Sequence, residues 1–197
     1  MQITFIDTET TGFPKRGVTL DKQPWVLQLG LITTNEWLRP MFTYCAVIDI
    51  PQDAEIPEAA AEIHGIRRIH LDEFGVSPRS ITNFYCQVVA RADLVVMHNL
   101  SYDTTMMKIM AERFGLDVPN FNSLCTMLTA TDVLELPGRY PGKYKWPKLE
   151  EAFKYFVGAD MPGAHDALAD VRGTIEVFRG LLDAGVVDLD KYKRSTK

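Results

Sequence analysis

The sequence is poor in cysteine, contains no long apolar run and carries no excess of basic charge. Its three cysteines, Cys45, Cys86 and Cys125, are far apart and form no Cys-x-x-Cys pair, so neither a disulfide framework nor a thiolate zinc site is predicted. We expect them to be small buried side chains in a reducing compartment. The apolar runs are shorter than the roughly 18 residues of a membrane span, and the basic and apolar pattern of a signal peptide is missing. We therefore predict a cytoplasmic protein with no membrane partner.

Length and composition indicate a folded chain with one core. The chain has 197 residues, of which 46% are hydrophobic and 24% charged, as is typical of globular proteins. The formal net charge of −5 provides no global basic field, so any contact with nucleic acid has to be local. We predict a single domain over residues 1–185, followed by a short, basic and loosely held tail over 186–197.

Apolar periodicity predicts the order of the secondary structure. Extended segments come first, at 2–6, 25–34 and 41–50, and short connections make them antiparallel neighbours. Two further strands are predicted at 93–97 and 121–127. Helices are predicted at 57–66, 80–93, 101–115, 128–136, 148–158 and 165–184. We expect Ser80 and Ser101 to be N-caps and Pro147 to lie in a first helical turn. This order predicts an α/β fold with a central mixed five-stranded sheet flanked by helices, in which the opening strand is central.

The opening strand runs into two acidic side chains, in "DTETTG" from Asp7 to Gly12. Residues two apart in an extended segment share a face, so Asp7 and Glu9 lie side by side. Two like charges about 4 Å apart repel by roughly 4 kcal/mol at an effective dielectric constant of about 20. The pattern indicates a bound cation, although acidic pairs after a strand are also common in turns.

Two further polar clusters stand at the ends of predicted apolar elements. They are "HNLSYD", from His98 to Asp103, and "HDALAD", from His165 to Asp170. Each has a structural interpretation when taken alone. Asp103 could simply favour the positive end of a helix, and His165 could be a capping or surface residue. The order and spacing of all three clusters favour a functional interpretation.

Together the three clusters resemble the DEDDh exonucleases, the family of the proofreading epsilon subunit of bacterial replicative polymerase, ribonuclease T and oligoribonuclease. The family motifs Asp-x-Glu-Thr-Thr-Gly, His-Asn-x-x-aromatic-Asp and His-x-x-x-x-Asp are matched by "DTETTG", "HNLSYD" and "HDALAD". A sister group has Tyr four residues before the last Asp. Here that position is Asp166, while His165 precedes Asp170 by five, which indicates the histidine branch. The resemblance extends to about residue 180 and implies a ribonuclease H-like fold.

The resemblance also implies a chemistry and a set of site residues. It implies hydrolysis at a 3' end that releases a 5'-mononucleotide, with two Mg²⁺ ions about 3.5–4 Å apart, for which Mn²⁺ can substitute. Asp7 would bridge both ions, Glu9 and Asp170 would complete the first, and Asp103 would support the second. His165 would be the general base that takes a proton from the attacking water. We assign no ligand role to Asp166.

Five residues are candidates for binding the substrate. The backbone of Thr10 would meet the terminal 3'-hydroxyl, and Phe13 would wedge against the last base. His64, in "IHGI", resembles a residue that the family places beside the terminal nucleotide, but it could equally be a helix-end histidine before a glycine cap. Asn99 and Tyr102 join these candidates because they fall inside the second motif.

One segment outside the motifs combines basic and aromatic side chains. Residues 139–148, "RYPGKYKWPK", include no acidic residue, and such a mixture suits a single strand with its phosphates and exposed base faces. The alternative is a solvated loop whose Trp146 packs against the following helix. Arg67 and Arg68 could extend a local basic track.

We predict a 3'–5' exonuclease that acts on single-stranded 3' ends. DNA is favoured because "DTETTG" looks more like the proofreading and general DNA group, which suggests DNA repair. An exoribonuclease of the ribonuclease T or oligoribonuclease type and a catalytically silent nucleic-acid-binding module are the alternatives. A different metal protein could use His98 and His165 as ligands, but the oxygen-rich donors favour magnesium or manganese over zinc.

Two departures from the family pattern narrow these expectations. Gln28 stands where many relatives have Glu, so we expect no auxiliary acidic role at that position. The tail lacks the long polymerase-binding segment and the clamp-binding peptide of bacterial proofreading subunits. We therefore do not expect stable attachment to a polymerase or a clamp.

Overall fold

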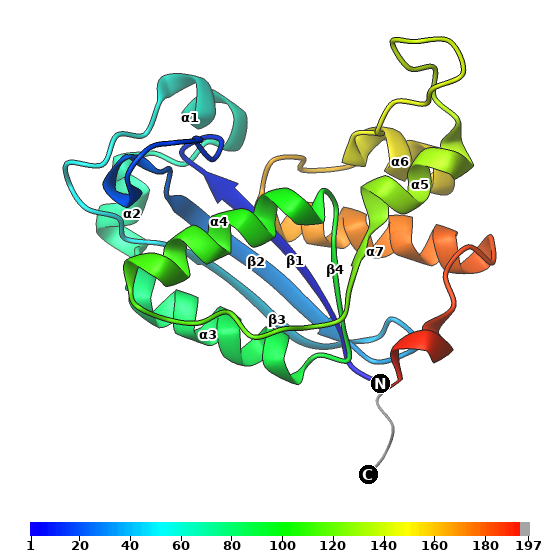
Figure 1. Ribbon diagram of the computed structural model, residues 1–197, viewed down its shortest axis with the longest axis horizontal. Coiled ribbons are helices and arrows are strands. Elements are labelled where there is room, and N and C mark those ends of the chain that lie inside the picture. The colour runs from blue at the N-terminus through cyan, green and yellow to red at the C-terminus, as the bar shows by residue number, and fades with distance from the viewer. Residues whose placement is uncertain (194–197) are drawn as a thin grey trace.

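The computed structural model describes residues 1–193 and has a mixed five-stranded sheet at its centre (Figure 1). The strand order is β3-β2-β1-β4-β5. The strands are β1 (Ile3–Thr10), β2 (Val26–Thr34), β3 (Pro40–Val47), β4 (Leu94–Met97) and β5 (Ser123–Cys125). β1 pairs antiparallel with β2 and parallel with β4, so the predicted mixed sheet with a central opening strand is confirmed.

Helices cover both faces of the sheet. They are α1 (Glu58–His64), α2 (Arg68–Phe74), α3 (Pro78–Arg91), α4 (Leu100–Arg113), α5 (Thr126–Leu134), α6 (Leu149–Val157) and α7 (Ala167–Asp183). One buried cluster joins Ile6 of β1 to Tyr85 of α3 and Met106 of α4. A second joins Phe5 to Phe178 of α7. These two rings pack edge to face, with their centroids 5.3 Å apart. The sheet is thus the middle of three layers.

The alternation of side chains along β1 decides which helix layer each residue faces. Ile3 and Phe5 belong to the cluster that includes α7, whereas Ile6 belongs to the one that includes α4. The same alternation places Asp7 and Glu9 on the α7 face. β4 pairs only with Ile3, Thr4 and Phe5, so the last part of β1 extends beyond its parallel neighbour. That part of β1 carries the acidic motif.

Two serines are not the helix caps that we predicted. α3 begins at Pro78, and Ser77 is its N-cap, accepting from the backbone N–H of Ser80 at 3.4 Å. Proline is favoured in the first turn, so the Ser-Pro pair is the stronger start signal. Ser101 lies inside α4, whose N-cap is Asn99 in a left-handed conformation with φ 68°, which asparagine tolerates better than most residues.

The last two helices also start later than predicted. Pro147 precedes the N-cap of α6, which is Lys148, and therefore lies outside the first turn. α7 begins at Ala167 with Asp166 as its N-cap. His165 consequently stands in the preceding turn, with φ 70°, rather than at the start of the helix.

The burial of the cysteines and the tail also differs from the prediction. Cys45 is exposed on β3, and Cys86 and Cys125 are only partly buried. β3 lies at the edge of the sheet, so among the described strands only β2 pairs with it. The tail is not loose up to residue 193, because Leu189 and Tyr192 in a 3-10 helix (Leu189–Tyr192) pack against the second cluster. Residues 194–197 lie outside the described part of the chain.

Within the described residues 1–193, none of the helices combines the length and apolar character needed to cross a membrane.

Candidate active site

Three of the predicted carboxylates converge at the C-terminal part of β1. One oxygen each from Asp7, Glu9 and Asp170 lie within 4.8 Å of one another, and all three side chains are half-buried. Asp7 and Glu9 come from the α7 face of β1, and Asp170 comes from the first turn of α7. Three acidic groups at this spacing could hold a cation through oxygen atoms.

Asp103 lies beside this group and is held by β1. It is 2% exposed, and its Oδ1 accepts from the backbone N–H of Thr8 at 3.1 Å and from the Thr8 hydroxyl at 2.7 Å. The Thr8 N–H is available because β1 has extended beyond β4. The acid in the first turn of α4 is therefore a buried partner of the central strand rather than a surface residue near a helix end.

Burial and mutual repulsion raise the pKa of every acid in the cluster. The pKa of Asp7 is well above its ordinary value because of burial and then the charges of Asp103, Asp170 and Glu9. Burial, followed by the charge of Asp170, raises the pKa of Glu9 to about 8. Burial raises the pKa of Asp170 to about 6, and it also raises that of Asp103. Full ionisation of the four carboxyl groups is therefore unfavourable, and a bound cation would offset their mutual repulsion.

His165 lies at the rim of the cluster on a strained turn. Its φ of 70° is uncommon for a residue with a Cβ, and such strain is often found at functional sites. The backbone N–H of His165 donates to Oδ1 of Asp170 at 3.3 Å. Its side chain is exposed, and Nε2 lies 3.8 Å from Oε1 of Glu150 in α6. The imidazole can therefore reach a substrate while its backbone is held beside the acidic cluster.

Two residues of β2 position the start of α7. We did not predict either of them as functional. The Oε1 of Gln28 accepts from the backbone N–H of Ala167 at 3.0 Å, and its Nε2 donates to Oδ2 of Asp166 at 3.2 Å. A Cβ at Gly30 would lie 2.6 Å from the backbone carbon of Ala167. The sequence contained a signal for this packing, since a glycine inside a strand often marks a close backbone approach.

A groove of about 640 Å³ opens over this end of β1. Glu9 and His165 line it, and its walls come from α1, from the start of α4 and from the segment before α6. Such a volume is within the range of small-ligand sites. Figure 1 shows β1 ending between α1 on one side and α5 and α6 on the other.

The motif residues after Glu9 form one side of this groove. Tyr102 and Thr10 share a hydrogen bond between their hydroxyls, and the Tyr102 hydroxyl donates to the carbonyl of Gly12 at 3.1 Å. The ring of Phe13 packs edge to face on that of Tyr102, with the ring centroids 5.5 Å apart. Phe13 remains 78% exposed. The partly buried Tyr102 therefore supports an aromatic ring that faces the solvent.

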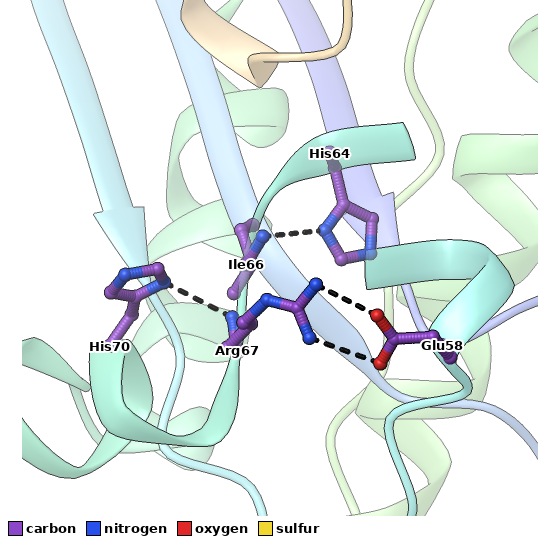
Figure 2. Close-up of polar contacts among 5 residues, drawn as sticks. All are labelled: Glu58, His64, Ile66, Arg67 and His70. Atoms are coloured by element: carbon purple, nitrogen blue, oxygen red, sulfur yellow. Dashed lines mark hydrogen bonds and ion pairs between the residues drawn. The ribbon is translucent and has the colours of Figure 1, made fainter. Parts of the chain in front are cut away.

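His64 lies at the end of α1 and also lines the groove. Figure 2 shows how the turn holds it, with the Ile66 N–H donating to Nδ1 of His64 at 3.0 Å. Burial lowers the pKa of His64, and the nearby His165 lowers it further. His64 ends α1 before the left-handed Gly65, and a contact with the terminal nucleotide stays a prediction.

The two arginines that follow have partners within the protein. Arg67 forms a two-pronged ion pair with Glu58 at 3.0 and 2.8 Å, as Figure 2 shows. Arg68 donates to the backbone carbonyls of Ile50 and Ala54. These contacts hold both guanidinium groups within the α1–α2 region, and a role in a basic track stays a prediction.

His98 is placed as a structural residue. Its Nε2 donates to the carbonyl of Pro147 at 3.0 Å, and its Nδ1 lies 3.0 Å from the hydroxyl of Thr126. With both ring nitrogens engaged, it is not available as the metal ligand of the alternative interpretation. Asn99 begins the turn into α4 and lines the groove.

Comparison with protein families and curated proteins gives consistent matches. A family model named RNase T and described as an exonuclease matches residues 4–178. A curated phage protein, uncharacterized exonuclease CP81 of Escherichia phage 186, is 29% identical over 188 residues. That alignment covers 92% of this chain and 88% of the phage protein.

Solved structures share the fold. E. coli Exonuclease I in complex with a dT13 oligonucleotide superposes with a TM-score of 0.75 at 17% identity, covering 92% of this chain and 41% of that one. The nuclease domain of 3'hExo, a DEDDh family member bound to rAMP, superposes with a TM-score of 0.69 at 14% identity. That match covers 94% of this chain and 93% of the other. The present chain thus spans about two fifths of Exonuclease I, and the expected fold is confirmed.

Proposed function

We propose, on the premise that this chain belongs to the RNase T family of exonucleases, that it removes 5'-mononucleotides one at a time from the 3' end of single-stranded DNA. The observation that carries the proposal is the convergence of Asp7, Glu9 and Asp170 within 4.8 Å, beside a groove that His165 also lines. We further propose that residues 1–185 act as one exonuclease domain, since both helix layers pack on one sheet.

The residues present fit divalent metal ions. The donors are all carboxylate oxygens, which suit Mg²⁺ or Mn²⁺ better than zinc, and burial and mutual repulsion raise their pKa values. Asp7, Glu9 and Asp170 would hold one ion, and Asp7 and Asp103 would hold a second. Such ions, when bound, neutralise the carboxylates and the phosphate and make the attacking water more acidic.

The side chains of the protein would then carry the proton and place the substrate. His165 takes a proton from the attacking water as its oxygen bonds to phosphorus and the bond to the preceding 3'-oxygen breaks. The products are a 5'-mononucleotide and a strand with a new 3'-hydroxyl. Within residues 1–193, the ring pairs with Glu150 at 3.8 Å and its side chain is 49% exposed, which leaves it able to turn toward that water.

The substrate end would lie along the motif residues of the groove. The Thr10 backbone meets the terminal 3'-hydroxyl, and Phe13, exposed and supported by Tyr102, stacks on the last base. His64 and Asn99, from the facing walls of the groove, contact the same nucleotide. DNA is proposed because "DTETTG" resembles the proofreading group, and RNA is the alternative that the experiment below distinguishes.

The test is degradation of matched 5'-labelled single-stranded DNA and RNA of the same base sequence. Each strand is incubated with Mg²⁺, with Mn²⁺ and with a chelator, and Asp7→Asn is the inactive control. We expect a metal-dependent ladder that shortens from the 3' end and is stronger for DNA. A stronger RNA ladder would replace DNA by RNA as the substrate. No ladder on either strand, or equal activity in Asp7→Asn, would contradict the proposal and favour a silent binding module.

A further inference from the structure

The segment between α5 and α6 forms a hairpin that extends beyond these two helices (Figure 1). Pro137 and Tyr144 form an antiparallel bridge, and the Gly138 N–H donates to the Lys143 carbonyl at 2.9 Å. The Lys145 N–H donates to the Leu136 carbonyl at 3.0 Å. A Cβ at Gly138 would lie 2.3 Å from the Lys143 carbonyl oxygen, so the two arms approach closely only because this residue is glycine. Backbone hydrogen bonds therefore close the segment into a hairpin, whose residues 139–146 are exposed.

The hairpin displays aromatic rings and positive charge. Tyr140 is 65% exposed and Trp146 is 66% exposed, so Trp146 does not pack against the following helix as the alternative interpretation required. Four basic residues and no acidic one lie in 139–148, in a chain whose formal net charge is −5. Exposed rings among basic residues attract a polyanion that has free aromatic faces.

The base of the hairpin is attached to the candidate active site. The carbonyl of Pro147 accepts from Nε2 of His98 at 3.0 Å, and His98 directly follows β4. The Lys145 ammonium pairs with Glu151 in the first turn of α6. The position of Trp146 relative to the acidic cluster is therefore set by β4 on one side and by α6 on the other.

Trp146 and Phe13 line the same groove from different segments. Phe13 follows the end of β1, and Trp146 comes from the hairpin before α6. Lys148 lines the groove beside Trp146, and Glu9 and His165 line it as well. The groove thus offers two exposed aromatic rings from segments far apart in the chain, together with acidic and basic groups.

We propose that the hairpin binds the single strand just upstream of the nucleotide that is removed, with Trp146 stacking on a base and Arg139 and Lys143 contacting its phosphates. This inference rests on the proposed exonuclease function and adds a second aromatic contact to it. A duplex keeps its base faces stacked inside, so this contact selects for unpaired strands.

The test compares two substrates that differ only in the upstream strand. One is a 5'-labelled dT8, and the other is thymidine 5'-phosphate p-nitrophenyl ester, in which p-nitrophenolate replaces all upstream nucleotides. In Trp146→Ala we expect the ratio of kcat/KM on dT8 to kcat/KM on the ester to fall about 5- to 150-fold, the range measured for single stacked bases. We expect Trp146→Phe to restore most of the ratio.

Trp37→Ala is the matched control, because Trp37 is 67% exposed and lies in the turn between β2 and β3. That turn is at the opposite end of the sheet from Glu9, since β2 runs antiparallel to β1. We expect this variant to keep the wild-type ratio. Removing charge should act differently: Arg139→Ala and Lys143→Ala should each reduce the slope of log KM against log salt by about 0.7.

Three outcomes would overturn the inference while the exonuclease function stands. Unchanged kcat/KM on both substrates in Trp146→Ala would show that the hairpin does not contact the strand. An equal loss on dT8 and on the ester would place Trp146 at the reacting nucleotide instead. A blunt duplex that competes as well as dT8, with the same dependence on Trp146, would contradict selection for single strands.

A binding measurement separates failure of this inference from failure of the proposed function. Fluorescence anisotropy of labelled dT12 is measured with Asp7→Asn, alone and combined with Trp146→Ala. If the wild-type protein cleaves no strand but Trp146→Ala still weakens binding at least fivefold, the exonuclease proposal fails and the hairpin site stands. If binding is strong and the second substitution leaves it unchanged, the hairpin site fails.

Discussion

Side-chain alternation along β1 gives its neighbouring residues different partners. Asp7 and Glu9 face α7 and meet Asp170, whereas the hydroxyl and N–H of Thr8 hold Asp103 of α4. Asp7 and Glu9 thus come from the central strand, Asp103 is hydrogen-bonded to it, and Asp170 of α7 lies beside the first two. Small movements of one residue in β1 would disturb all of them.

At the residue scale, His165→Ala tests the proposed general base. We expect kcat to fall about 10²- to 10⁴-fold, since proton transfer by a positioned side chain contributes on that order. Metal binding should remain, because only the backbone N–H of His165 contacts Asp170. The measurements are single-turnover cleavage of 5'-labelled DNA and the increase in melting temperature that Mn²⁺ produces.

His70→Ala is the control for that prediction, since His70 lies on α2 and is absent from the residues that line the groove. It should cleave at close to the wild-type rate. If His165→Ala loses the Mn²⁺ effect along with activity, His165 is a metal ligand and not a base.

Gln28 is a positioning residue in the same region. Gln28→Ala leaves the buried N–H of Ala167 without its partner, at a cost of about 1–3 kcal/mol in the free energy of unfolding. We also expect a kcat about 10- to 100-fold lower, because the start of α7 carries Asp170 and directly follows the turn that holds His165. For Gln28→Glu we expect the loss of kcat relative to wild type to be larger at high pH than at low pH. This variant places a second carboxylate beside that of Asp166.

The measurements for Gln28 are thermal melting and single-turnover rates across pH. Gln87→Ala, on the exposed side of α3, controls for loss of an amide. A Gln28→Ala variant that melts earlier but cleaves at the wild-type rate would show that Gln28 supports the fold alone.

At the scale of elements, the contact of α7 with β2 brings Asp170 to the acidic cluster. Gly30 pairs directly with Asp7 across the two strands, and its missing side chain lets the Ala167 backbone reach the sheet. The start of α7 therefore lies over β2, one strand away from Asp7 and Glu9 of β1. Asp170 of α7 completes the acidic cluster with these two residues. A side chain at this position would push the helix outward.

Gly30→Ala tests this contact. A methyl group there would lie 2.6 Å from a backbone carbon, and overpacking of this kind costs about 1–3 kcal/mol. We expect an earlier thermal transition and a loss of cleavage larger than the stability change alone explains, because Asp170 moves away from Asp7 and Glu9. Thr43→Ala, on the exposed side of β3, should change neither property. An active Gly30→Ala enzyme would show that the start of α7 can shift without affecting the site.

At the scale of the whole molecule, the acidic cluster makes the stability of the metal-free protein depend on pH. The pKa of Glu9 rises from 4.5 to about 8 in the folded state, and the pKa values of Asp7, Asp103 and Asp170 are also raised. A carboxyl with a raised pKa binds its proton more tightly when folded than when unfolded. Its contribution to stability is therefore present at low pH and is lost as the pH rises through the folded pKa.

We expect the melting temperature in chelator to fall between about pH 4 and pH 8, the range between the unfolded and folded pKa values of these acids. Saturating Mg²⁺ or Mn²⁺ should remove most of this decline, because the ions replace the protons and bind the folded state alone. Asp7→Asn in chelator should melt higher than wild type at pH 8 and show a shallower slope. Equal slopes for Asp7→Asn and wild type in chelator would contradict the idea that the cluster is strained without a cation.

Much of this protein could be predicted from local patterns alone. The central place of the opening strand, the five-stranded mixed sheet and the α/β class follow from the spacing of apolar residues and the lengths of the connections. The three motifs pointed to the exonuclease family because their residue types and order are unusual in combination. The cap positions were less predictable, since Ser80, Ser101 and Pro147 are weak signals beside Ser77 and Asn99.

Only the tertiary structure decided which of these residues meet, because their contacts cross long stretches of chain. Thr8 and Asp103 are 95 residues apart in sequence, and Gln28 and Asp166 are 138 apart. No local pattern encodes such pairs, which arise when a strand and two helix starts pack at one end of a sheet. The sequence by itself determined the elements and the carboxylates. The packing decided that Asp103 binds β1, that Gln28 and Gly30 seat α7, and that the hairpin with Trp146 lines the groove.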